Sequence, residues 1–174
     1  MVVHILRLAH RAARDKRVTT HLGLVARAFG AEKMLVTGLK DEHLADSIQR
    51  VVDNWGGPFE VEFTKSWRSV LKKYKENGFA IAHLTMYGLP VQKVMPKIRT
   101  NKDLLIIVGG EKVPWEVYEQ TDFNVAVTNQ PHSEISALSV FLDRFFDGKE
   151  FEKNFSDAKK LIVPNKKGKS IKTL

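Results

Sequence analysis

The sequence contains no cysteine, and this absence excludes several kinds of site at once. Disulfide bridges, zinc sites built on thiolates and cysteine nucleophiles all require that side chain. His4 and His10 flank the first apolar segment, but no second ligand stands at metal-binding spacing from either of them. We therefore expect a protein without a metal site.

Long apolar runs are also missing. Arg7 interrupts the first apolar run after only a few residues, which is untypical of a signal peptide. No stretch approaches the roughly eighteen apolar residues that are needed to cross a bilayer. We expect a soluble, cytoplasmic protein with no membrane partner.

A third absence concerns nucleotide binding. Doubly wound α/β domains commonly bind nucleotides through a glycine-rich turn that follows the first strand. Here the first apolar segment runs into residues 9–14, Ala-His-Arg-Ala-Ala-Arg, and the next glycine is Gly23. No Walker A sequence exists either. Dinucleotide-binding and P-loop functions are therefore disfavoured.

Positive charge is present in excess and is unevenly distributed along the chain, which carries a net charge of +8. Residues 1–20 contain five lysine and arginine residues against one aspartate, and residues 150–174 contain seven lysines against three acidic residues. The remaining chain is balanced. Positive charge gathered at two ends favours a polyanionic partner, and nucleic acid is the leading candidate. A merely disordered lysine-rich tail is the alternative.

Apolar segments with strand character alternate with segments of helical periodicity. Strands are expected at residues 2–8, 33–36, 59–63, 79–84, 104–108 and 125–127. Helices are expected at residues 18–29, 41–55, 67–74, 91–98, 114–119 and 134–146. This alternation predicts an α/β domain over residues 1–150, with a mostly parallel sheet covered by helices on both faces, and a basic extension over residues 151–174. The last helix is apolar on nearly every side, which would suit a dimer interface.

Three late strands end in small and polar residues that precede a helix. The first ends in Leu-Thr-Met-Tyr-Gly at residues 84–88, and the second in Gly-Gly-Glu-Lys-Val-Pro at residues 109–114. The third ends in Thr-Asn-Gln-Pro-His-Ser-Glu at residues 128–134. Open α/β sheets bind ligands at the carboxyl ends of their strands. The pattern predicts one shared pocket at these three ends.

These blocks, together with Arg-Asp-Lys-Arg-Val-Thr-Thr-His at residues 14–21, resemble the archaeal tRNA (cytidine-2′-O-)methyltransferases of the SPOUT class. Members of that family modify the T-loop cytidine at tRNA position 56. The resemblance implies a trefoil knot in the C-terminal half of the sheet, S-adenosylmethionine (AdoMet) bound in the knot loops, tRNA as substrate and a homodimer.

The same resemblance implies a cofactor site in the three late loops and the residues beside them. Its expected members are Leu84, Met86, Gly88, Gly109, Gly110, Glu111, Lys112, Val113, Val127, Thr128, Asn129, Gln130, Pro131, His132, Ser133, Glu134 and Leu138. Glycine permits close approach of backbone N–H groups to a ligand, and Ser133 suits the N-cap of the last helix. An ordinary strand-to-helix turn is the alternative for Gly109 and Gly110.

Methyl transfer to a ribose hydroxyl requires alignment of the hydroxyl and loss of its proton, which a nearby cation or base facilitates. We expect Arg17 to serve this purpose, with Arg14 and His21 as alternatives. We also expect Arg11, Arg14, Lys16 and Arg17 to contact RNA. A role in phosphate binding alone is the alternative for these basic side chains.

Three other functions stay open from the sequence. A non-enzymatic RNA-binding protein on the same fold would retain RNA without binding AdoMet. A flavodoxin-like enzyme acting on a small nucleotide would not depend on tRNA. A methyltransferase of the same class that modifies a different nucleotide is the third alternative. The three tryptophans could stack on a base, but we expect them to pack in the core or an interface.

Overall fold

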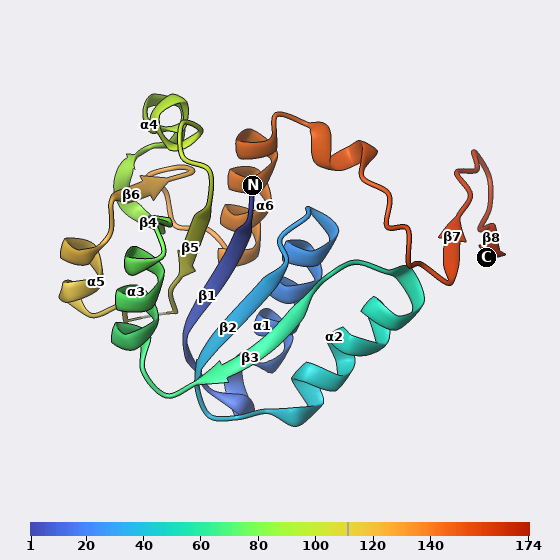
Figure 1. Ribbon diagram of the computed structural model, residues 1–174, viewed down its shortest axis with the longest axis horizontal. Helices are drawn as coiled ribbons and strands as arrows, with labels where there is room; N and C mark the ends of the chain where they lie inside the picture. Colours follow the sequence, from blue (N-terminus) through green and yellow to red (C-terminus); the bar gives the residue numbers. More distant parts are fainter. Residues whose placement is uncertain (111) are drawn as a thin grey trace.

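The computed structural model describes residues 1–110 and 112–174, and a six-stranded sheet forms its centre (Figure 1). The strand order is β3-β2-β1-β5-β4-β6, and every neighbouring pair is parallel. The strands are β1 (Val3–His10), β2 (Lys33–Gly38), β3 (Glu60–Thr64), β4 (Ala80–Pro90), β5 (Leu104–Val108) and β6 (Phe123–Ala126). The predicted α/β class with a parallel sheet is confirmed.

Helices cover both faces of the sheet. The helices are α1 (Ala12–Ala28), α2 (Glu42–Trp55), α3 (Trp67–Glu76), α4 (Val91–Ile98), α5 (Trp115–Gln120) and α6 (Glu134–Phe146). One apolar core joins α1, α2, α4 and α6 to the sheet, and a second joins α3 and α5 to the opposite face. Every residue of β5 is buried because this strand lies between β1 and β4 with helices above and below it.

The predicted edge strand at residues 59–63 corresponds to β3, which ends the sheet on one side. Glu60 and Glu62 of β3 are exposed, and both carboxylates pair with the Lys33 ammonium at 3.0 and 3.2 Å. Charged side chains on an edge strand discourage pairing with another chain.

The helix predicted over residues 18–29 begins at Ala12, so this boundary was wrong. The added turns are polar, and hydrophobic periodicity cannot detect a polar helical turn. Asp15 stabilises the start of α1, since its carboxylate accepts a hydrogen bond from the backbone N–H of Arg11 at 3.1 Å.

The strand predicted over residues 79–84 continues to Pro90 as β4. Its first part pairs with β6 up to Leu84, the register then shifts, and Leu89 and Pro90 pair with β6 again. Gly88 lies against the β6 backbone so closely that a Cβ atom there would approach Asn124 to 2.5 Å. Only glycine permits this close crossing.

The apolar helix α6 finds most of its cover within the same chain. Ala137, Leu138, Phe141, Leu142 and Phe145 are buried, and they join the core that α1 and α4 also form. A partner protomer is therefore not needed to bury these side chains, contrary to the reasoning from apolarity alone. Val140 remains 39% exposed.

The basic extension folds into a short helix and a hairpin. A 3-10 helix, η1 (Lys149–Glu152), leads to β7 (Lys160–Ile162) and β8 (Ile171–Thr173), which pair antiparallel. The Arg27 guanidinium lies 4.4 Å from the Phe155 ring centroid, and Asp157 accepts from the Gly57 N–H at 2.9 Å. These contacts attach the extension beside α2, while the hairpin projects away from the sheet (Figure 1).

None of the helices in the described part of the chain is long and apolar enough to cross a membrane. Within residues 1–110 and 112–174, no three His, Cys, Asp or Glu side chains are grouped as metal ligands.

Candidate active site

A cavity of about 410 Å³ lies at the carboxyl ends of β1, β4 and β5, beside the first turns of α1 and α6. Parallel α/β sheets commonly bind ligands at this edge, because loops from several strands meet there. The volume falls within the range of small-ligand sites. The structure therefore forms a pocket at the ends of the strands where the sequence predicts one, and β1 contributes to it as well.

The predicted cofactor residues divide into two groups. Those that line the cavity are Leu84, Met86, Gly109, Gly110, Val113, His132 and Glu134. Those that are described but lie outside its lining are Gly88, Lys112, Val127, Thr128, Asn129, Gln130, Pro131, Ser133 and Leu138. Glu111 lies outside the residues that the structure describes.

Several residues of the second group stabilise the loops, a helix end or the core instead of lining the cavity. Asn129 donates from its amide to the carbonyl of Met86 at 2.7 Å, which ties the loop after β6 to the segment that follows Leu84. Ser133 caps α6 by accepting from the Ile135 N–H at 3.2 Å, as predicted. Leu138 is fully buried in the core.

The turn after β5 requires glycine at its first position. A Cβ atom on Gly109 would approach Val113 Cγ2 to 2.2 Å, which no packed structure tolerates without displacement. At Gly110 the nearest atoms would be the Arg7 guanidinium nitrogens at 3.8 and 4.0 Å, which is ordinary contact. The cavity wall at Gly109 is therefore formed by bare backbone.

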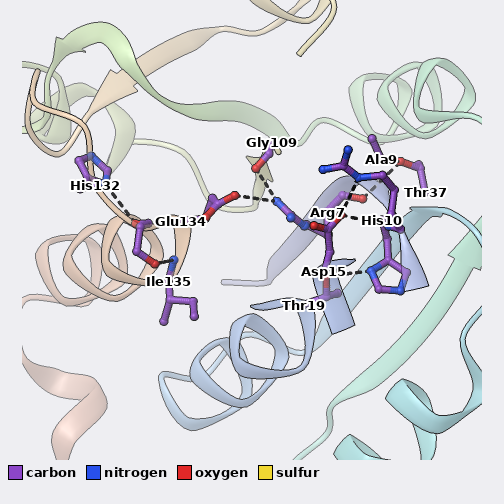
Figure 2. Close-up of polar contacts among 12 residues, drawn as sticks. Arg7, Ala9, His10, Asp15, Thr19, Thr37, Gly109, His132, Glu134 and Ile135 are labelled. Atoms are coloured by element: carbon purple, nitrogen blue, oxygen red, sulfur yellow. Dashed lines mark hydrogen bonds and ion pairs between the residues drawn. The ribbon is translucent and has the colours of Figure 1, made fainter. Parts of the chain in front are cut away.

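Arg7 is a buried cation in the wall of the cavity, and the sequence reasoning missed it. It reaches from β1 to donate a hydrogen bond to the carbonyl oxygen of Gly109, and its guanidinium lies 3.7 Å from the Glu134 carboxylate (Figure 2). Burial lowers the pKa of Arg7, and Glu134 opposes that shift. One side chain thus contacts both the turn after β5 and the first turn of α6.

The first turn of α1 supplies further cations. Arg11 and Arg14 line the cavity together with Asp15. Arg11 Nε donates to the Asp15 carboxylate at 3.2 Å. Burial alone would raise the pKa of Asp15, but hydrogen bonds from the Arg11 side chain and backbone outweigh it and hold the pKa below its usual value. Lys16, Arg17 and His21 are exposed and lie outside the lining.

The entry into α1 is held by a buried polar cluster. Ala9 adopts a positive φ of 53°, which is uncommon for a residue with a side chain, and its N–H donates to Thr37 Oγ1 at 2.9 Å. His10 Nδ1 lies 3.0 Å from Thr19 Oγ1 (Figure 2). These contacts redirect the chain at the end of β1, so that Arg11 and Arg14 reach the cavity.

Residues that the sequence reasoning did not assign complete the lining. They are Arg7, Asp15, His83, Thr85, Tyr87, Val108, Tyr118 and Ala137. Arg7 and His83 carry a usable signal, because each is a titratable residue with apolar neighbours on both sides within a strand. Among the tryptophans, Trp115 is 69% exposed and stacks on Tyr118 with ring centroids 5.6 Å apart.

Solved structures share the fold at low sequence identity. An RNA 2′-O ribose methyltransferase superposes with a TM-score of 0.64 at 15% identity, covering 85% of this chain and 57% of that protein. The SpoU methyltransferase AviRb from Streptomyces viridochromogenes, solved in complex with AdoMet, superposes with a TM-score of 0.62 at 14% identity, covering 85% of this chain and 58% of that protein. The similarity supports the SpoU/TrmH type of α/β fold.

Sequence relatives are much closer. The model of the family described as tRNA ribose 2′-O-methyltransferase, aTrm56, matches residues 55–172. A tRNA (cytidine(56)-2′-O)-methyltransferase of Thermococcus kodakarensis is 53% identical, over 98% of this chain and 96% of the relative. The enzyme of the same name from Methanocaldococcus jannaschii is 52% identical over the same shares. This chain belongs to the family of tRNA (cytidine(56)-2′-O)-methyltransferases.

Proposed function

We propose that this protein transfers the methyl group of AdoMet to the 2′-hydroxyl of the T-loop cytidine at tRNA position 56. One observation carries the proposal: a cavity rimmed by Arg11 and Arg14 lies at the strand ends of a chain that is about half identical to enzymes of that name. A tRNA substrate also favours a cytoplasmic enzyme.

The residues of the cavity fit AdoMet. Leu84, Val108 and Ala137 offer an apolar surface for the adenine, and the bare backbone at Gly109 allows close approach. The buried Nε2 of His83 has no hydrogen-bond partner in the described chain, which is a frequent sign of a polar ligand group. When bound, AdoMet supplies an activated methyl group on a sulfonium.

The position of Arg14 suits a role at the reacting ribose. Its side chain lines the cavity, whereas Arg17 and His21 lie on α1 outside the lining. A guanidinium beside the 2′-hydroxyl would orient the oxygen and stabilise the negative charge that develops as its proton leaves. We therefore rank Arg14 ahead of Arg17, with His21 as the third candidate.

The basic surface suits the RNA backbone. Arg11, Arg14, Lys16 and Arg17 are exposed at the start of α1, beside the cavity. The hairpin adds a second basic region, because six exposed lysines and no acidic residue lie between positions 159 and 174. Such contacts contribute affinity and register without reading sequence.

We also propose a trefoil knot and a homodimer, as the family resemblance implies. The tie from Asn129 to the Met86 carbonyl and the close crossing at Gly88 support loops that pass tightly around one another. Tyr87 and Leu89 are 76% and 62% exposed, and apolar side chains of this size at a protein surface suit a subunit interface.

The test is methyl incorporation from labelled AdoMet into unmodified tRNA transcripts. One transcript is wild type, and the other carries a 2′-O-methyl group on the T-loop cytidine. The proposal predicts label in the first transcript alone. Label in both transcripts would move the target to another nucleotide. No label, with no AdoMet binding, would leave a non-catalytic RNA-binding protein on this fold.

A further inference from the structure

His83 is a buried histidine whose ligand group the proposed function leaves unassigned. It lies on β4, its side chain is fully buried, and it lines the cavity. Its Nε2 atom has no hydrogen-bond partner among the described residues. A buried polar atom without a partner is destabilising, so such an atom in a cavity wall points to a ligand group.

The surrounding hydrogen bonds determine which ring nitrogen carries the proton. The Asn124 amide nitrogen donates to the carbonyl oxygen of Tyr118 at 2.8 Å, so the Asn124 oxygen faces the histidine. His83 Nδ1 lies 2.9 Å from that oxygen and must donate to it. Burial lowers the pKa of His83, which keeps the ring neutral. Nε2 is therefore a lone-pair acceptor.

The ring is held in place, and its free nitrogen faces the turn after β5. The Tyr118 ring packs edge-on against it with centroids 4.7 Å apart, and Tyr118 OH lies 3.3 Å from Thr85 Oγ1. A Cβ atom on Gly109 would lie 3.9 Å from His83 Nε2. Nε2 itself is closed to solvent, so a ligand would contact it only after a small displacement of the adjoining turn.

The surroundings of His83 Nε2 indicate which kind of ligand group would donate a hydrogen bond to it. A neutral acceptor in a dry site pairs best with a neutral O–H or N–H group. The Arg7 guanidinium, which donates to the Gly109 carbonyl oxygen, disfavours an ammonium or sulfonium group beside this turn. The apolar surface suited to the base, formed by Leu84 and Ala137, belongs to the α6 face of the sheet, whereas His83 faces α5. A hydroxyl also accepts from the backbone N–H groups of a glycine turn.

We propose that His83 Nε2 accepts a hydrogen bond from a ribose hydroxyl of AdoMet and so helps to select and orient the cofactor. This inference rests on the proposed function, since it assumes that AdoMet occupies the cavity. It assigns the recognition of a ribose hydroxyl to β4, rather than to the late loops alone.

The experiment is calorimetric binding of S-adenosylhomocysteine and of its 2′-deoxy and 3′-deoxy analogues. We expect wild-type protein to bind one deoxy analogue about tenfold more weakly than the parent. His83→Phe should bind the parent about tenfold more weakly and should lose the discrimination against that same analogue. His83→Gln, which keeps an acceptor, should recover part of the affinity for the parent and part of the discrimination against the analogue.

His4→Phe is the matched control. His4 is a half-buried histidine on β1 whose Nδ1 lies 2.7 Å from the Tyr74 hydroxyl oxygen, and it lies outside the cavity lining. This variant should discriminate between the analogues as the wild type does. Nitrogen-15 NMR of wild-type protein gives a second readout that needs no variant, because the His83 Nε2 resonance should shift with the parent ligand and shift less with the weaker analogue.

Two results would overturn the inference. Equal discrimination by wild type and His83→Phe, with an unchanged Nε2 resonance, would remove His83 from ligand binding while leaving the proposed function intact. Failure of wild-type protein to bind both AdoMet and S-adenosylhomocysteine would instead overturn the proposed cofactor, and this inference with it.

Discussion

The two basic ends of this chain look alike in sequence but differ in the structure. The N-terminal segment, residues 11–17, begins helix α1 at the rim of the cavity, and two of its arginines line the wall. Six of the C-terminal lysines lie on or beside a hairpin that projects beyond α2, and all six are exposed (Figure 1). We therefore propose different tasks for the two ends: the first acts on the reacting ribose, and the second adds affinity for the RNA backbone.

The largest expected effect is at Arg14. Arg14→Ala should lower kcat for tRNA methylation about 10²- to 10³-fold, because it removes the cation proposed to stabilise the developing alkoxide. Arg17→Ala is the control on the next turn of α1, and it should mainly raise the KM for tRNA. Single-turnover methyl transfer with saturating AdoMet and varied tRNA separates an effect on the rate of transfer from an effect on tRNA binding. A larger kcat loss for Arg17→Ala would reverse our ranking.

A second prediction concerns protein stability and the turn after β5, where the Gly109 carbonyl accepts a hydrogen bond from Arg7. Gly109→Ala should destabilise the protein by about 1–3 kcal/mol, because its Cβ collides with Val113. Gly110→Ala should change stability by less than about 0.5 kcal/mol, since its Cβ meets only ordinary contacts. Urea unfolding measures both. Adding Val113→Ala should restore part of the loss at Gly109, and no restoration would contradict the geometry.

A smaller effect is expected at the hairpin. Replacing Lys166, Lys167 and Lys169 together with alanine should weaken tRNA binding severalfold and reduce the salt dependence of log Kd by up to about 2–3 units. AdoMet affinity should not change, because the hairpin lies away from the cavity. Filter binding at several salt concentrations gives the slope. An unchanged slope would show that the hairpin does not contact the RNA.

The smallest expected effect is a pH dependence of stability. Burial lowers the pKa values of His4, His10 and His83 in the folded protein. The unfolded chain then binds more protons than the folded one below about pH 6.5, so the free energy of unfolding should fall as the pH decreases through this window. Urea unfolding between pH 7.5 and 5.5 measures it. His10→Phe should reduce the slope, and a stability that rises toward pH 5.5 would contradict the burial of these rings.

Much of the fold follows from the sequence. The strands are short runs of β-branched and apolar residues, and each sits between helices of clear periodicity, so both element type and order could be predicted. The start of α1 could not be predicted, because residues 11–15, Arg-Ala-Ala-Arg-Asp, have no apolar stripe. This helix start is stabilised instead by the Asp15 carboxylate. The extension of β4 to Pro90 depends on pairing with β6, which is a contact between distant segments.

The site was predicted less completely than the fold. The glycines and the loops after three strands could be predicted from their residue types, but residue type alone does not determine which side chains of these loops face the cavity. From the sequence, Arg7 was interpreted as an interruption of an apolar run. In the structure it lies on the same face of β1 as the buried residues Val3 and Ile5, because side chains two positions apart in a strand share a face. The distinction between Arg14 and Arg17 depends on the true start of α1.

The most direct test of the difference between the two basic ends is methyl transfer at saturating tRNA and AdoMet, with Arg14→Ala and the triple lysine variant measured side by side. We predict that the lysine variant regains the wild-type rate at saturation, while Arg14→Ala stays at least about 10²-fold slower. A lysine variant that remains slow at saturation, or an Arg14→Ala protein that recovers fully, would contradict the division of roles proposed for the two ends.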